Sequence, residues 1–294
     1  MKTILISGAN GFIARNFMHA FAHKYKFIRL SHSNTTENHI SMADLQQAPQ
    51  LLQEVDIVLN LAGAGIGDKK WNTQQKHELL TSRLTTTSQL VTLFNQHNPN
   101  AHFISASAIG IYPTDCECDE NTPINYQEYH NFSQEITRKW ETTAHNYSGN
   151  LTITRFGVVL AGNGGAFPKM LQPFKIYVGG KIGRGNQYFT WIALPDLLHA
   201  LEMIIDQTIV GTYNLTAPLA LSNHELSSII ANTWHKPNWL PLPEFMIKLL
   251  FGQMGEELFL NSLQVVPTRL LEQNFNFIYP DFASCALAIK NNKF

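Results

Sequence analysis

The chain has 294 residues, of which 44% are hydrophobic and 15% charged, an ordinary composition for a globular protein with a large core. Its 21 basic and 22 acidic residues nearly balance, so no strong field invites nucleic acid or an anionic membrane. The sequence shows no signal-peptide pattern, no apolar run of about 18 residues and only three cysteines, which fits a reducing compartment. We therefore expect a cytoplasmic protein with no nucleic-acid or membrane partner and no metal site.

A strand–turn–helix pattern opens the chain. An apolar run ends at Gly8, and Ile13, Phe17 and Phe21 then recur every four residues, as on one face of a helix. Glycines at such a junction let a pyrophosphate approach the backbone at the positive end of the helix. The pattern therefore predicts a dinucleotide site formed by Gly8, Asn10, Gly11, Phe12, Ile13 and Arg15.

A second strand is predicted at residues 27–30, and the residues after it bear on which dinucleotide binds. NAD-binding proteins usually place an acidic residue there, about 20 residues after the glycines, to hold the ribose 2′-hydroxyl. Here Ser31 and His32 follow Arg29, and no acidic residue is present. Such groups, with the nearby Arg15, suit a 2′-phosphate that a carboxylate repels. We therefore expect NADP rather than NAD, held in part by Ser31 and His32; alternatively, Arg15 and His32 are solvated surface residues.

A nearly continuous apolar run at residues 56–63 is typical of a parallel strand buried on both faces. It ends in the small residues Ala62 and Gly63, against which a cofactor ring or ribose can lie. We place Leu61, Ala62 and Gly63 in the cofactor site. A long helix is predicted at residues 72–97, begun by a capping box at Asn72.

The next predicted strand, residues 103–108, carries two hydroxyl groups near its carboxyl end, those of Ser105 and Ser107. In open α/β sheets this edge binds the ligand. Further on, the pattern predicts a helix at 133–146, one buried strand at 151–160, a helix near 196–205 and a strand at 212–216.

Alternating strands and helices predict an α/β fold with a doubly wound parallel sheet, a Rossmann fold. Residues 1–165 and about 190–217 are assigned to the dinucleotide-binding domain. Residues 166–189 and 218–294, where glycine and then proline interrupt the pattern, are assigned to a smaller substrate lobe. Cys116 and Cys118 have no second cysteine pair nearby, so we interpret them as part of a surface loop rather than a zinc site.

The chain resembles the extended short-chain dehydrogenase/reductase superfamily, and within it the "epimerase family protein" subgroup with a C-terminal domain of unknown function. The segments that carry the resemblance run nearly end to end and include GANGFIAR, NLAGAGIGDKKW, TSRLTTTSQL, SASAIGIY, TRFGVVLAGNGGAF and GTYNLTAP. The resemblance implies a Rossmann fold and a nicotinamide cofactor. It places Arg83, where many relatives have asparagine, near the nicotinamide or substrate, and Ser105 beside the cofactor.

The resemblance also predicts how the site departs from the usual chemistry. In the superfamily a serine at the end of the fifth strand works with a Tyr-x-x-x-Lys pair, whose lysine lowers the tyrosine pKa. Ser107, or alternatively Ser105, matches the serine, but the positions expected to hold the tyrosine and lysine fall near Ser133 and Thr137. A replacement proton carrier is therefore implied, with Tyr112, Tyr126, Tyr129, His130 and bound water as the candidates. Our catalytic candidates are Ser107, Tyr112 and Tyr129.

Two functions remain open. The first is an NADP(H)-dependent oxidoreductase or epimerase that acts on a small molecule of unknown identity. The second is a catalytically silent NADP(H)-binding regulator or sensor. The sequence is compatible with a homo-oligomer in either case.

Overall fold

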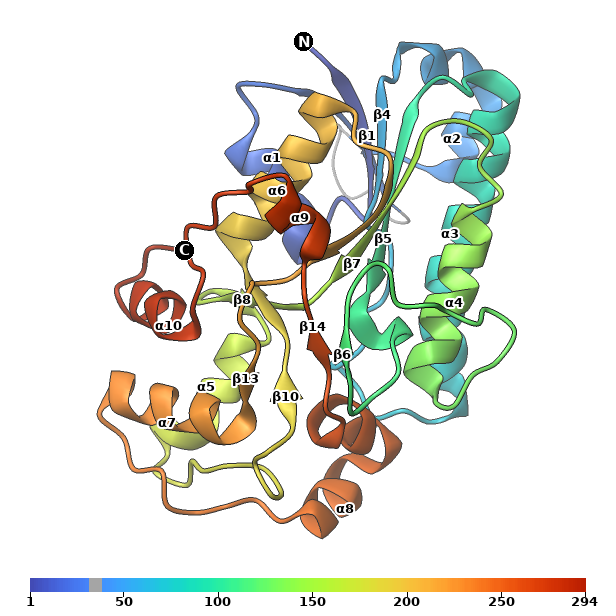
Figure 1. Ribbon diagram of the computed structural model, residues 1–294. Helices are drawn as coiled ribbons and strands as arrows, with labels where there is room; N and C mark the ends of the chain where they lie inside the picture. The colour runs from blue at the N-terminus through green and yellow to red at the C-terminus, as the bar shows by residue number, and fades with distance from the viewer. Residues whose placement is uncertain (32–38) are drawn as a thin grey trace.

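The structure is a computed structural model that describes residues 1–31 and 39–294. Within these residues seven parallel strands form one sheet, in the order β12-β7-β5-β4-β1-β2-β3 (Figure 1). The strands are β1 (Thr3–Ser7), β2 (Lys26–Leu30), β3 (His39–Ile40), β4 (Ile57–Asn60), β5 (His102–Ala108), β7 (Leu151–Phe156) and β12 (Gly211–Leu215). The strand order reverses at β1, which confirms the predicted doubly wound sheet.

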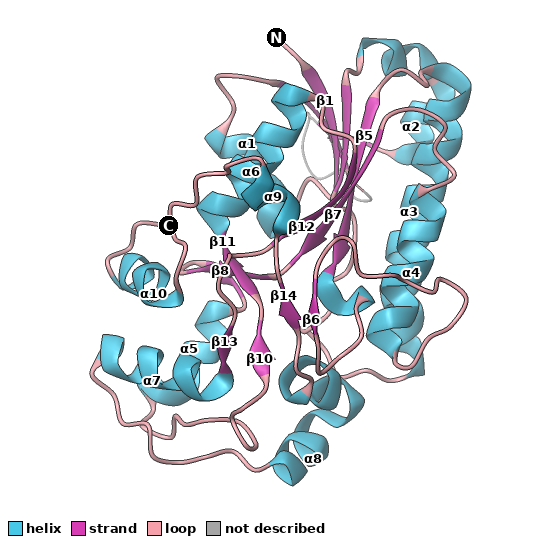
Figure 2. Ribbon diagram, viewed as in Figure 1, coloured by secondary structure: helices cyan, strands magenta, loops and turns pink. Residues whose placement is uncertain are grey.

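Helices cover both faces of this sheet (Figure 2). On one face Phe17 and Leu197 belong to the core beneath α1 and α6, and on the other Leu45 and Phe94 belong to the core beneath α2 and α3. The helix α4 lies beside α3 and over β5. The bounds of these helices are α1 (Phe12–Ala20), α2 (Met42–Gln47), α3 (Thr73–His97), α4 (Phe132–Ala144) and α6 (Leu194–Gln207).

The single strand predicted at residues 151–160 is wrong, because the chain leaves the main sheet in its middle. The strand β7 ends at Phe156, and β8 (Val158–Ala161) pairs instead with β11 (Trp191–Ala193) and β9 (Gly164–Gly165). The switch occurs at Gly157, where a Cβ would lie 3.1 Å from the backbone of Trp191. A Cβ there is tighter than ordinary van der Waals contact, so glycine eases the close crossing of the two segments.

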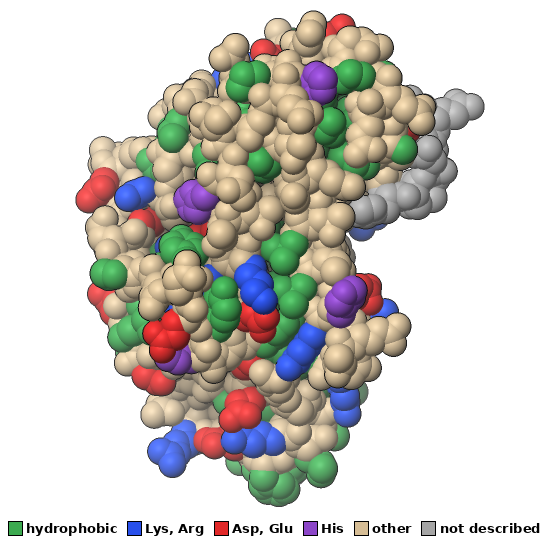
Figure 3. Space-filling model, turned by 90° about the vertical axis from the view of Figure 1, so that its right-hand side faces the viewer, with side chains coloured by type: hydrophobic (Ala, Val, Ile, Leu, Met, Phe, Trp, Pro, Cys, Tyr) green, Lys and Arg blue, Asp and Glu red, His purple; other side chains and the backbone are tan. Residues whose placement is uncertain are grey.

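Most of the remaining segments form a lobe at the carboxyl end of the sheet, below it in Figure 1. Short strand pairs join distant parts of the chain: β6 (Glu117–Cys118) with β14 (Gln264–Val265), and β10 (Tyr188–Phe189) with β13 (Leu221–Ser222). The helices of the lobe are α5 (Phe167–Lys175), α7 (Asn223–Trp234), α8 (Glu244–Gly255) and α10 (Phe282–Lys290), whereas α9 (Thr268–Glu272) packs against β12 of the main sheet. No helix in the described ranges has the length and apolarity needed to cross a membrane. On the face drawn in Figure 3, acidic and basic side chains are interspersed.

One buried histidine makes the stability of this sheet depend on pH. His102 of β5 is buried with Nε2 2.7 Å from Thr152 Oγ1, and burial, aided by the charge of Lys2, lowers its pKa from 6.5 to about 4. As the pH falls from 6.5 toward 4, the unfolded chain therefore takes up a proton that the folded chain does not. We expect the free energy of unfolding to drop by on the order of 2 kcal/mol between pH 7 and 4.5 from this group.

Urea unfolding at the two pH values measures this loss. The control is His102→Gln, which removes the titrating group and should show a smaller drop. An equal drop in both proteins would contradict the assignment to His102.

Candidate functional site

The loop between β1 and α1 makes a tight turn that depends on two glycines. Gly8 has a φ of +64°, and the Gly11 N–H donates to the Gly8 carbonyl at 2.7 Å. A Cβ on Gly8 would lie 2.9 Å from the Leu61 carbonyl oxygen, and one on Gly11 would lie 2.9 Å from that of Gly8. Both the backbone conformation and the close approach of the next strand therefore exclude larger residues.

This loop leaves the N-terminus of α1 open. Gly11 is the N-cap residue and, within the described part of the chain, no side chain caps the helix. The first N–H groups of a helix have no partner inside it and lie at the positive end of its dipole. Asn10 and Gly11 are exposed, whereas Phe12 and Ile13 are half-buried. An uncapped helix end beside a glycine cradle fits the paired phosphates of a dinucleotide.

The carboxyl end of β4 forms the neighbouring wall. Ala62 is buried and Gly63 exposed, and a Cβ on Gly63 would lie 3.0 Å from Arg83 Cζ. Arg83 of α3 donates to the Leu79 carbonyl at 3.0 Å and stacks 5.1 Å from the centre of the Trp140 ring. In the described residues its guanidinium has no carboxylate partner, and burial lowers its pKa to about 10. Arg83 is thus a charged group at neutral pH, held at the sheet edge and open to an anion.

A chain of buried polar side chains supports this wall, and sequence reasoning did not find it. Ser7 Oγ accepts from the Ala62 N–H at 3.2 Å and donates to Asn60 Oδ1 at 2.6 Å. Asn60 Nδ2 donates to Thr87 Oγ1, which also accepts from Trp140 Nε1 at 3.0 Å. The only sequence signal was polar residues at the ends of apolar strands. These bonds fix β1, β4, α3 and α4 relative to one another at the site.

The structure describes three of the residues that bear on the choice between NADP and NAD. Arg15 is exposed, Arg29 is half-buried in β2, and Ser31 is buried just after that strand. The parallel pairing of β1 with β2 puts Leu30 opposite Ser7, so Ser31 lies at the same sheet edge as the glycine loop. His32 lies outside the described residues.

Ser107 and Tyr112 belong to one buried network beneath α4. Glu141 of α4 and Arg155 of β7 form a bidentate ion pair, with Nε–Oε1 and Nη2–Oε2 distances of 2.8 Å. Ser107 Oγ and Tyr126 Oη each donate to this carboxylate at 2.7 Å. Arg155 Nη1 donates to Tyr112 Oη at 2.8 Å. Only 1% of Glu141 and 3% of Arg155 is exposed, so the pair is isolated from solvent.

The network controls the ionisation of its members. Burial alone lowers the pKa of Arg155, but its hydrogen bonds and attraction to Glu141 outweigh burial and hold the pKa above the ordinary value. Burial raises the pKa of Tyr112 to about 12 despite Arg155 and a hydrogen bond from its hydroxyl to Asn214 Oδ1 at 2.8 Å. Burial and then Glu141 raise the pKa of Tyr126 as well. Both phenols are therefore protonated at neutral pH.

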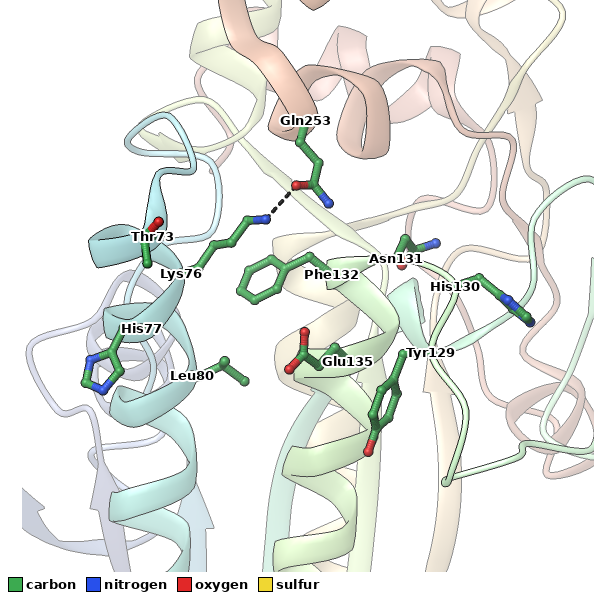
Figure 4. Close-up of a pocket in the computed structure, with 10 residues that line it drawn as sticks. All are labelled: Thr73, Lys76, His77, Leu80, Tyr129, His130, Asn131, Phe132, Glu135 and Gln253. Carbon is green, nitrogen blue, oxygen red and sulfur yellow. Dashed lines mark hydrogen bonds between the residues drawn. The ribbon is translucent and has the colours of Figure 1, made fainter.

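Tyr129 lies apart from this network. It is 39% exposed, and Lys139 Nζ lies 5.6 Å from the centre of its ring. Together with His130 it borders a cavity of about 580 Å³ between the N-terminal parts of α3 and α4 (Figure 4). Gln253 of α8 closes one end of this cavity and accepts a hydrogen bond from Lys76. Ser105, by contrast, is buried in β5, with its hydroxyl 3.4 Å from the Ala106 carbonyl oxygen.

Ser133 and Thr137, at the positions where a tyrosine and a lysine are expected, form hydrogen bonds with other protein groups. Ser133 Oγ donates to Glu257 Oε2 at 2.6 Å, and its N–H donates to the same atom at 2.8 Å. Thr137 is buried, and its hydroxyl donates a hydrogen bond to the Ser133 carbonyl at 2.7 Å. A Cβ on Gly110, just past β5, would lie 3.2 Å from Ser133 Cβ. A carboxylate from the C-terminal segment, Glu257, therefore caps α4 beside the end of β5.

Comparisons with known proteins cover nearly the whole chain. A family model described as "NAD dependent epimerase/dehydratase family" matches residues 4–215, and a domain of unknown function, DUF1731, matches residues 242–289. The Staphylococcus saprophyticus "Epimerase family protein SSP1921" is 33% identical over 297 residues, which cover 96% of this chain and 97% of that protein. The Staphylococcus aureus "Epimerase family protein SAR0825" is 30% identical over 296 residues, covering 95% and 96%.

Two solved structures share both fold and sequence with the chain. The human epimerase family protein SDR39U1, crystallised with NADPH, superposes with a TM-score of 0.90 at 27% identity and covers 99% of each chain. The nucleoside-diphosphate sugar epimerase from Corynebacterium glutamicum superposes with a TM-score of 0.79 at 27% identity, covering 99% of this chain and 58% of that one.

Proposed function

Because the chain belongs to the NAD-dependent epimerase/dehydratase family, we propose that it binds NADP(H) and acts as an oxidoreductase or epimerase on a small molecule. The observation that carries this proposal is the loop from Gly8 to Gly11, where a positive φ, a close approach to Leu61 and an uncapped helix meet. The groups that would hold the dinucleotide are the N–H groups of this loop and the small residues Ala62 and Gly63. The nicotinamide supplies the hydride chemistry when bound.

The preference for NADP(H) is supported by residues of α1 and β2. Arg15 and Arg29 supply two guanidinium groups on this side of the site, and a 2′-phosphate forms charge-assisted bonds with such groups. The human relative was crystallised with NADPH. We expect calorimetric titration to give at least a tenfold lower Kd for NADPH than for NADH, about 1.4 kcal/mol.

Arg15→Glu should remove most of this difference, because it places a carboxylate near the phosphate while leaving the exposed helix surface intact. The matched control is Lys26→Glu, at the opposite end of β2, which is exposed and pairs only with Glu54 at 3.7 Å among the described residues. Equal Kd values for the two dinucleotides in the wild-type protein would contradict the preference, and no binding of either would contradict the proposed function.

The position of Arg83 supports the proposal that the protein catalyses a reaction as well as binding the cofactor. The lysine of the usual dyad supplies positive charge beside the reacting centre, and the α4 positions here carry Ser133 and Thr137 instead. The guanidinium of Arg83 lies at the same sheet edge and has no carboxylate partner in the described ranges. We propose that it takes over the electrostatic role by attracting negative charge on the cofactor or the substrate. Ser107 and Tyr112 then act as positioning residues, since both are buried in the Glu141–Arg155 network.

A second candidate function is a catalytically silent NADP(H)-binding regulator. It is favoured by the engaged hydroxyls of Ser133, Ser107 and Tyr112, each of which already has a protein partner. Screening carbonyl and alcohol compounds for NADPH turnover separates the two. Turnover that Arg83→Met reduces supports the enzyme, whereas tight NADPH binding with no turnover across the screen supports the regulator. The small number of cysteines, three in 294 residues, supports a cytoplasmic setting for either function.

A further inference from the structure

Two of the three free cysteines lie in contact with one another. Cys116 Sγ and Cys118 Sγ are 3.4 Å apart, in the segment that runs into β6. Cys116 is exposed and Cys118 is 2% exposed, so one thiol meets solvent and the other lies directly beneath it. Cys285, in α10, is fully buried. A disulfide S–S bond is about 2.05 Å long, so the distance between the two sulfurs exceeds it by little more than an ångström.

The backbone fixes this arrangement. Asp115 adopts a left-handed conformation with a φ of 63°, which turns the chain back just before Cys116. Its N–H donates to the Ser262 carbonyl at 3.0 Å. After the turn, Cys118 pairs with Val265 of β14, and its carbonyl accepts from the Val266 N–H at 2.8 Å. Cys116 lies in the bend that precedes β6 and Cys118 lies in the strand itself, and this bend holds the two sulfurs in contact.

We propose that Cys116 and Cys118 form a redox-active dithiol that low-molecular-weight disulfides, such as oxidised glutathione, convert to an intramolecular disulfide. The Cys116 thiolate attacks one sulfur of the small disulfide, whose S–S bond breaks and releases one thiolate. Cys118 then loses its proton and attacks the Cys116 sulfur of the mixed disulfide, which releases the second small thiolate. The protein loses two hydrogen atoms in total, and one small disulfide is reduced to two thiols.

The order of the two steps follows from the surroundings of each sulfur. Only Cys116 is open to a molecule the size of glutathione. Burial, followed by the contact with Cys116, raises the pKa of the Cys118 thiol, so it is a poor nucleophile toward molecules in solution. Its reaction with a sulfur already held 3.4 Å away is intramolecular and avoids the cost of an encounter.

Mass spectrometry of the full-length protein after treatment with oxidised glutathione tests this proposal. We expect the wild-type protein to lose two hydrogen atoms, with a Cys116–Cys118 bond in the tryptic peptides and Cys285 still open to alkylation after denaturation. Cys118→Ser should stop at a stable glutathione adduct on Cys116. Cys116→Ser should remain unmodified.

Each variant replaces only one sulfur by oxygen, and thermal unfolding of both variants shows whether the fold is kept. A wild-type protein that retains a glutathione adduct, or that stays fully reduced while Cys118→Ser is modified, would overturn the proposal. A bond that instead includes Cys285 would overturn it as well.

Discussion

Replacing Glu141 with glutamine is expected to lower the free energy of unfolding by about 3–5 kcal/mol, because it leaves the buried charge of Arg155 without its counter-charge. The two groups are 1% and 3% exposed, so water cannot compensate for the lost carboxylate. Ser107 and Tyr126 also lose the charged acceptor of their hydroxyl protons. Urea unfolding followed by circular dichroism at pH 7 measures the change.

A double variant shows whether the cost arises from the unpaired charge. Glu141→Leu combined with Arg155→Met replaces the pair by apolar side chains of similar size, which is often tolerated at buried ion pairs. We expect this double variant to be more stable than Glu141→Gln alone. If Glu141→Gln costs less than about 1 kcal/mol, the range of an exposed pair, the network is not the stabilising element we describe.

Replacing Gly8 with alanine is expected to weaken NADPH binding by at least about 100-fold, or about 2.7 kcal/mol. The added Cβ would lie 2.9 Å from the Leu61 carbonyl oxygen, at a residue whose φ of +64° disfavours any side chain. The loop must therefore move away from β4, and the N–H groups of α1 lose their alignment with the phosphates. Calorimetric titration gives the affinity, and thermal unfolding shows whether the fold persists.

The matched control is Gly67→Ala, in the loop after β4. A Cβ there meets only Leu258 Cδ1, at 3.9 Å, which is ordinary contact. This variant should bind NADPH as the wild-type protein does. Unchanged binding by Gly8→Ala, with the control also unchanged, would show that the glycine loop does not hold the phosphates.

The glycine loop could be predicted from the sequence because everything that defines it is local. Strand, turn and helix follow within a few residues, and the helix α3 likewise begins at Asn72, whose side chain accepts from the Gln75 N–H at 2.7 Å. Patterns of this kind depend on neighbours in the chain. They specify the fold and the cofactor half of the candidate site.

The Glu141–Arg155 network could not be predicted in this way. Glu141 occurs in a polar helical segment, where the pattern indicates a solvated side chain, and Arg155 interrupts an apolar strand. Their burial depends on partners from β5, β7 and β12, which the sheet brings together across up to 102 residues of sequence. The break at Gly157 could not be predicted for the same reason, since β8 pairs with β11, more than 30 residues further along the chain.

The contact between Glu257 and the start of α4 has a consequence for how the molecule responds to ligands. The carboxylate belongs to the C-terminal segment, yet it binds the Phe132 and Ser133 N–H groups, 125 and 124 positions earlier. The C-terminal segment therefore supplies a cap for a helix of the Rossmann domain. A ligand that moved the π-helical turn Glu256–Leu260 would therefore have to carry the start of α4 with it or break these hydrogen bonds.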